Sequence, residues 1–180
     1  MLGSASLHIL ANYYQPLNGA LAINMEIILQ DIYSLSDIPN EYTDDPKFES
    51  ELMTKYIGAL AGSEKLYINI DSLKPGAKSS KFHSHTLKEE FFIILKGSGK
   101  VRINENLFSV KKGDFFSKPA GKGISHQFIN DSSDILEILD CGINDKNDIV
   151  EYPEENIILV QGKAYEKSAA VREWTSDPNN

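Results

Sequence analysis

Short apolar segments, separated by closely spaced turn residues, limit what this chain can fold into more than any other feature. Eight such segments follow one another between residues 64 and 160. Turn-forming residues interrupt them repeatedly, as in Pro75-Gly76 and in the run from Pro119 to Gly123. Strands of this length and spacing are typical of an all-β barrel or sandwich. The predicted strands are residues 65–73, 90–95, 100–103, 107–110, 115–118, 126–130, 135–141 and 157–160.

The rest of the chain is predicted to flank a single barrel domain. A chain of 180 residues can bury a sufficient core without disulfides, and the only cysteine, Cys141, has no partner within the chain. We assign residues 1–63 to an N-terminal extension partly packed on the barrel, 64–162 to the barrel and 163–180 to a C-terminal tail. Segment 48–60 has a nearly helical apolar spacing, and both helix and strand stay open there.

The charge balance argues against nucleic acids and anionic membranes as partners. Acidic residues outnumber basic ones by 26 to 18, which gives a formal net charge of −8, whereas such partners are bound by clustered Lys and Arg. The first 24 residues lack the basic head of a secretory signal, because the first Lys or Arg is Lys47. No run approaches the roughly 18 apolar residues of a membrane span. We therefore expect a cytoplasmic protein.

Three of the four histidines are placed where they can meet. Side chains alternate between the two faces of a strand, so His83 and His85 point to the same side. Glu90 begins the next apolar strand and His126 begins a later one. Three imidazoles and one carboxylate suit Zn, Fe, Mn, Ni or Cu as a divalent ion, and ligand type alone does not choose among them. Two unrelated surface histidines are the alternative interpretation of an isolated His-x-His pair.

Two segments resemble the motifs of the cupin superfamily. HSHTLKEEFFIILKGSG is similar to the first motif, in which six residues separate the glutamate from a glycine, and counting back from Gly97 selects Glu90 over Glu89. GDFFSKPAGKGISHQFIN is similar to the second motif, although four residues rather than two separate Gly121 from His126. VEYP at residues 150–153 resembles a segment that follows the barrel in one group of bacterial cupins of unknown function.

The resemblance implies one double-stranded β-helix, or jelly-roll barrel, with an N-terminal extension and one divalent metal ion in its mouth. The metal ligands would be His83, His85, Glu90 and His126. It also implies a homodimer, and we expect a piece before Leu52 to pair with the second subunit.

The superfamily includes dioxygenases, decarboxylases, isomerases and sugar-binding modules, so the fold alone does not select a reaction. An ion with four protein ligands keeps positions open for a substrate. We expect a metal-dependent enzyme, an oxygenase or an isomerase/lyase, acting on a small oxygen-rich anion. The alternative is a non-catalytic module that binds or senses a small molecule.

Residues in phase with the ligands are candidates for the wall of the pocket. Phe92, Ile94 and Phe128 lie at even spacings from a ligand on their strands, and a role as barrel core is the alternative. Glu137 and Asp140 lie on opposite faces of one predicted strand, so at most one of them faces the interior. The sequence assigns no catalytic residue.

Overall fold

The computed structural model describes residues 32–38, 52–167 and 176–178. All of them belong to the second of two compact units, residues 31–180. Before Leu52, only residues 32–38 are described, and they contain a short 3-10 helix, η1 (Leu35–Asp37). The predicted pairing of a piece before Leu52 with a second subunit falls largely in that part.

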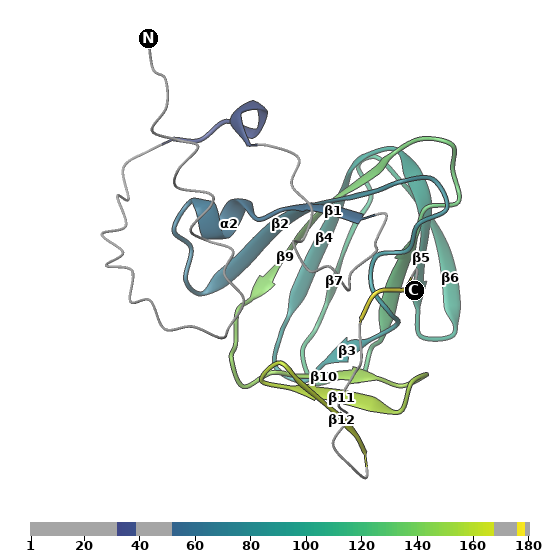
Figure 1. The fold of residues 1–180 in the computed structure, drawn as a ribbon. Coiled ribbons are helices and arrows are strands. Elements are labelled where there is room, and N and C mark those ends of the chain that lie inside the picture. Colours follow the sequence, from purple (N-terminus) through teal and green to yellow (C-terminus); the bar gives the residue numbers. More distant parts are fainter. Residues whose placement is uncertain (1–31, 39–51, 168–175, 179–180) are drawn as a thin grey trace. The chain divides into compact units, whose positions relative to one another are not determined.

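The described strands form three antiparallel sheets, and the largest has the order β1-β2-β9-β4-β7 (Figure 1). The central pairs are long: β2 pairs with β9 over eight residues, and β9 pairs with β4. Because β2 and β9 are distant in sequence, their pairing brings an early and a late segment of the chain side by side. Its strands are β1 (Leu52–Lys55), β2 (Leu66–Leu73), β4 (Glu90–Lys96), β7 (Phe115–Lys118) and β9 (Leu136–Ile143).

Two smaller sheets complete the described fold. A three-stranded sheet has the order β6-β5-β8, and a four-stranded sheet has the order β12-β11-β10-β3. Their strands are β5 (Ser98–Ile103), β6 (Asn106–Lys111), β8 (His126–Ile129), β3 (Ser84–His85), β10 (Ile149–Tyr152), β11 (Ile157–Val160) and β12 (Lys163–Glu166). Within the described ranges, no helix is long and apolar enough to cross a bilayer.

The all-β prediction is confirmed, and each of the eight predicted strands is present within two residues of its expected ends. Segment 48–60, where helix and strand stayed open, contains both: β1 is followed by a four-residue helix, α2 (Ile57–Leu60). Strand β1 falls in the predicted N-terminal extension and pairs with β2. Strand β12 begins the predicted C-terminal tail and pairs with β11.

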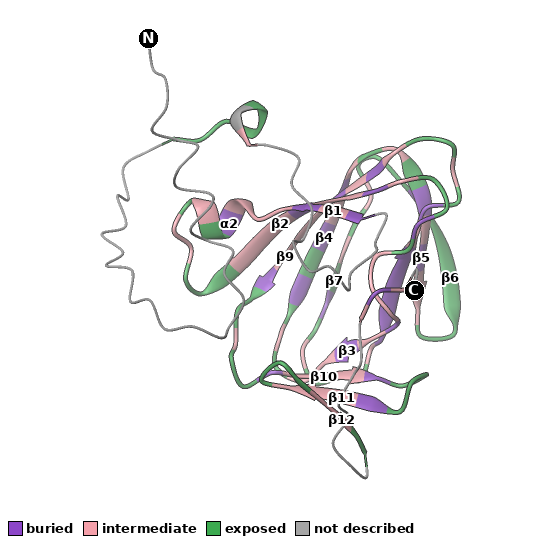
Figure 2. Ribbon diagram, viewed as in Figure 1, coloured by how far each residue is buried: buried purple, intermediate pink, exposed green. Residues whose placement is uncertain are grey.

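Alternation along the strands places the core between the five-stranded and three-stranded sheets. On β4, Glu90, Phe92 and Ile94 are buried while Phe91 is exposed. Figure 2 shows buried residues on β4 and β5, whereas β6 is exposed over most of its length. The buried apolar cluster comprises Leu52, Leu73, Ala77, Phe92, Ile94, Val101, Val110, Phe128, Leu136 and Ile138.

Polar side chains fix the turns that bring the strands together. Asn130 is fully buried after β8, and its amide donates hydrogen bonds to the carbonyls of Leu73 and Asp134. Its carbonyl oxygen accepts from the backbone and hydroxyl of Ser132. At Gly97, a Cβ would lie 2.4 Å from the carbonyl oxygen of Ile135, so the close approach of the β4–β5 turn to β9 requires glycine there.

Candidate metal centre

Backbone pairing brings His83 and His126 together although 43 positions separate them in the sequence. His83 directly precedes β3, and it forms an isolated antiparallel bridge with His126, the first residue of β8. The amide of His126 donates to the carbonyl of His83 at 2.9 Å, and the reverse hydrogen bond is 3.2 Å long. Glu90 begins β4 and faces inward from the adjacent sheet.

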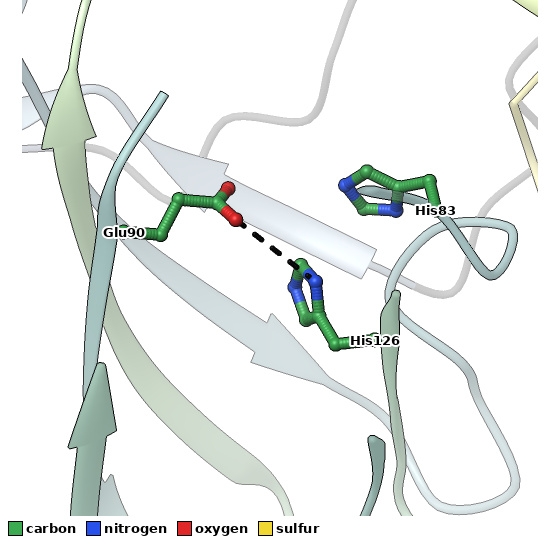
Figure 3. Close-up of side chains that lie close together, drawn as sticks. All are labelled: His83, Glu90 and His126. Carbon is green, nitrogen blue, oxygen red and sulfur yellow. Dashed lines mark ion pairs between the residues drawn. The ribbon is translucent and has the colours of Figure 1, made fainter. Parts of the chain in front are cut away.

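His83, Glu90 and His126 form a group that could hold a metal ion. Each offers one ligand atom, and these atoms lie within 4.8 Å of one another. Figure 3 shows both imidazoles on the side of the Glu90 carboxylate, with Nδ1 of His126 4.0 Å from Oε2. The ring centroids of the two histidines are 4.7 Å apart. Glu90 and His126 are buried, and His83 is half-buried.

The environment of His83 fixes its protonation for metal binding. Its Nδ1 lies 2.8 Å from the carbonyl oxygen of Lys81 and 3.0 Å from the Ser80 hydroxyl. A carbonyl oxygen only accepts, so Nδ1 carries the proton and Nε2 keeps its lone pair. Burial, with the charge of Lys118, holds the pKa of His83 well below its ordinary value. The same two causes lower the pKa of His126. Both rings are therefore neutral, the form that binds metals.

His85 lies beside this group and is held by Asp148. Its Nε2 is 3.3 Å from Oε1 of Glu90, and its Nδ1 is 2.5 Å from Oδ2 of Asp148. The other oxygen of Asp148 accepts hydrogen bonds from the amides of Leu87 and Lys88. One buried carboxylate thus orients an imidazole and fixes the turn that joins the His-x-His segment to Glu90.

Burial and hydrogen bonding have opposite effects on the pKa of Asp148. Burial alone would raise its pKa, but hydrogen bonds from the amide of Leu87 and from His85 bring it below its ordinary value. The carboxylate therefore stays charged and accepts the Nδ1 proton of His85. Burial lowers the pKa of His85 itself, against the opposing charge of Glu90.

A buried lysine that the sequence analysis did not select enters the centre from β7. The Nζ atom of Lys118 lies 2.5 Å from Oε2 of Glu90 and 2.7 Å from Nδ1 of His126. Only 3% of its side chain is exposed. Strand alternation could have indicated it, because Lys118 is in phase with Phe116, which packs against the core.

One carboxylate oxygen of the centre has a single close partner among the described residues. Oε2 of Glu90 is buried, and that partner is the ammonium group of Lys118. A buried carboxylate beside two neutral imidazoles fits the donor set of a divalent ion.

Polar side chains of β2 and β9 are linked to Glu90 by hydrogen bonds. The Tyr67 hydroxyl lies 3.0 Å from Oε1 of Glu90 and 2.9 Å from Oδ1 of Asp140. Burial, together with the charges of Asp71 and Glu90, raises the pKa of Asp140 well above its ordinary value. Burial raises the pKa of Asp71 to about 6, although the Thr54 hydroxyl donates to it. The environment therefore favours the neutral form of Asp140, whereas Asp71 is mostly charged above pH 6.

A cavity of about 400 Å³ opens onto the centre. Of the three residues predicted for its wall, Phe92 and Phe128 line it, whereas Ile94 lies farther along β4 in the core cluster and is not among its lining residues. Of the two carboxyls on the predicted 135–141 strand, Asp140 lines the cavity. The alternation of Tyr67, Asn69 and Asp71 with Ile68 and Ile70 was the sequence signal for this polar wall. Other polar lining residues are Ser63, Ser79, Ser80, His83, His85, Lys88, Glu90, His126 and Asn144, and Leu52, Tyr56, Ala59 and Leu66 also line the cavity.

Comparisons with known proteins show which proteins have a similar sequence and fold. The sequence profile of the cupin domain family matches residues 69–142. A protein of Acidithiobacillus ferrooxidans, provisionally described as a sugar phosphate isomerase, is 25% identical with a TM-score of 0.61, and the match covers 68% of this chain and 81% of that chain. No curated protein is similar enough in sequence to match.

Two further structures are less similar in sequence and support the fold alone. A sugar phosphate isomerase from the cupin superfamily of Silicibacter pomeroyi is 20% identical with a TM-score of 0.64, over 78% of this chain and 90% of that one. A Thermotoga maritima protein, provisionally described as an oxalate decarboxylase, is 22% identical with a TM-score of 0.53, over 63% of this chain and 98% of that one.

Proposed function

From the premise that this chain carries a cupin domain, we propose that it is a metal-dependent isomerase or lyase acting on a small, oxygen-rich anion. The observation that carries the proposal is the position of His83, Glu90 and His126 in the wall of a cavity that Tyr67 and Asp140 also line. Metal-binding groups and proton-transfer groups thus face the same space.

The residues fit a divalent ion with His83, Glu90 and His126 as ligands and His85 as the fourth. Asp148 accepts a hydrogen bond from Nδ1 of His85, so the proton of the neutral ring is on Nδ1. Nε2, on the side of Glu90, then keeps the lone pair that binds a metal. When bound, the ion would supply positive charge that polarises a carbonyl or hydroxyl oxygen of the substrate.

Tyr67 and Asp140 are the candidates for moving a proton. The Tyr67 hydroxyl has one proton and two carboxyl neighbours, so both contacts are satisfied together only when one carboxyl is protonated. The raised pKa of Asp140 assigns that proton to Asp140. A buried carboxyl with a raised pKa, hydrogen-bonded to a hydroxyl, suits general acid–base chemistry, such as removing and returning a proton beside a carbonyl.

The cavity lining favours a hydroxylated substrate over an apolar one. Asn69, Asp71, Ser79 and Ser80 line the cavity and offer hydrogen-bond donors and acceptors. The packed rings of Phe92 and Phe128 add apolar surface. The Acidithiobacillus ferrooxidans protein, provisionally described as a sugar phosphate isomerase, supports this class of substrate.

Deuterium incorporation tests the proposal without requiring the exact substrate. The protein, loaded in turn with Mn²⁺, Fe²⁺, Ni²⁺ and Zn²⁺, is incubated in D₂O with hydroxyaldehyde phosphates, ketose phosphates and 2-keto acids. We expect NMR to show deuterium beside the carbonyl of one class, and Asp140→Asn to abolish it with the metal content unchanged.

Two outcomes would contradict this function. Consumption of O₂ by the iron-loaded protein, without deuterium exchange, would indicate an oxygenase. Saturable binding of a compound without exchange or turnover would indicate a binding module.

A further inference from the structure

Lys118 contacts two of the three residues that could hold an ion in this centre. Its ammonium group lies 2.5 Å from Oε2 of Glu90 and 2.7 Å from Nδ1 of His126. An ion held by Glu90 and His126 would therefore lie close to a second positive charge, which is strongly unfavourable in a buried site.

The ammonium group has little room to leave. Lys118 ends β7, and its backbone pairs directly with Glu90 on β4. Its side chain is almost completely buried. Other carboxyl groups nearby do not offer an equivalent partner: Asp148 is engaged with His85, and Asp140 has a raised pKa that favours its neutral form. A buried ammonium without a counter-charge is costly, and burial already lowers the pKa of Lys118. Lys118 therefore keeps its charge beside a bound ion only when an anionic group takes the place of Glu90.

We infer that Lys118 is an anion-binding residue beside the metal. When Glu90 and His126 bind the ion, they release the ammonium group of Lys118, and this group then selects ligands with a negatively charged oxygen. The inference rests on the metal binding in the proposed function, and it adds the residue that recognises the charge. Before metal binding, Lys118 neutralises Glu90. After metal binding, it neutralises the anionic ligand, so metal and anion stabilise each other's binding.

The test uses Co²⁺ as the metal and formate as the anion, because formate carries one negative charge and binds free Co²⁺ weakly. The Co²⁺-loaded protein is titrated with formate and, separately, with neutral imidazole, and the visible absorption of Co²⁺ reports both. The variants are Lys118→Met and Lys118→Gln, with Lys118→Arg as the conservative change. Lys122→Met, an exposed lysine in the loop after β7, is the matched control.

We expect Lys118→Met and Lys118→Gln to bind formate about 10- to 100-fold more weakly, because a charge-assisted hydrogen bond is lost. Their affinity for Co²⁺ should be equal or higher, since the competing ammonium is gone. Imidazole binding should not change, Lys118→Arg should restore most of the formate affinity, and Lys122→Met should behave as wild type. The use of two variants separates a charge effect from a folding defect, which circular dichroism would detect in either.

Each contrary result has a distinct meaning. Equal formate affinity in wild type and both folded variants, with Co²⁺ bound, would overturn the role of Lys118 and leave the proposed function standing. Failure of the wild-type protein to bind Co²⁺ or any other divalent ion would overturn both.

Discussion

Oδ2 of Asp148 lies 2.5 Å from Nδ1 of His85, while Oδ1 of the same carboxylate accepts from the amide of Leu87 at 2.8 Å. The pairing of β10 with β3 creates this contact, because it places the residue before β10 against the His-x-His segment. Asp148 therefore supports the metal centre without facing it.

Asp148→Asn should weaken metal binding about 10- to 100-fold, the usual cost of losing a partner that orients a ligand histidine. The asparagine amide keeps the volume of the carboxylate but loses its charge. When its oxygen accepts from the Leu87 and Lys88 amides, its NH₂ group faces Nδ1 of His85 and cannot accept that proton. Competition with a chromophoric chelator measures the affinity. Asp134→Asn, at an exposed position, is the control and should have no effect. Equal affinities in both variants would show that Asp148 has no such role.

Asp71→Asn should stabilise the metal-free protein most above pH 6, and the gain should shrink steadily as the pH falls below 6 toward 4. The folded protein raises the pKa of Asp71 from 3.8 to about 6, so the charged form is penalised fully above the higher value and not at all below the lower one. We expect a gain on the order of 1–2 kcal/mol at pH 7.5, since each pKa unit corresponds to about 1.4 kcal/mol and the cavity partly solvates the carboxyl.

Urea unfolding of both proteins between pH 4.5 and 8 measures this difference. The Thr54 hydroxyl can still donate to the amide oxygen of the variant, so that contact is retained. A pH-independent difference between the two proteins would show that Asp71 ionises as readily in the folded protein as in the unfolded chain.

Gly142→Ala should destabilise the protein by about 1–3 kcal/mol and disturb the metal centre. A Cβ at Gly142 would lie 2.5 Å from the carbonyl oxygen of Glu89 and 2.8 Å from the Tyr67 hydroxyl, so both must shift. Because Gly142 pairs with Glu90, the displacement is transmitted to a ligand.

Gly113→Ala is the comparison for this prediction. Its added Cβ meets no described atom within 4 Å, and its cost of about 1 kcal/mol comes from the positive φ of 92°. Thermal unfolding gives the stabilities, and metal titration should be altered in Gly142→Ala alone. Unchanged metal affinity in Gly142→Ala would contradict the close packing of Tyr67 and Glu90 against this position.

Strand alternation and turn residues carry enough information to locate most of the fold. The inward face of β4, with Glu90, Phe92 and Ile94, follows from its sequence because the apolar alternation is regular. Strand β3 has only two residues, and its partner β10 lies more than 60 positions away in the sequence. No local sequence pattern therefore predicts either strand. In the same sheet, β11 was predicted and β12, which pairs with it, was not.

The candidate site also contains residues that the sequence predicted and residues that it did not. His83, Glu90 and His126 are selected by residue type and spacing, and the structure brings their ligand atoms together. Lys118 and Asp148 were not selected, because lysine and aspartate are usually exposed and only tertiary contacts show that these two are buried and paired.

Metal stoichiometry tests the central claim most directly. Wild-type protein and the variants His83→Ala, Glu90→Gln and His126→Ala are incubated with each divalent ion, passed over a desalting column and analysed for metal by mass spectrometry. We expect about one ion per chain in wild type and a strong loss in every variant, with circular dichroism unchanged. A wild-type protein that retains no ion, or variants that retain as much as wild type, would contradict the account.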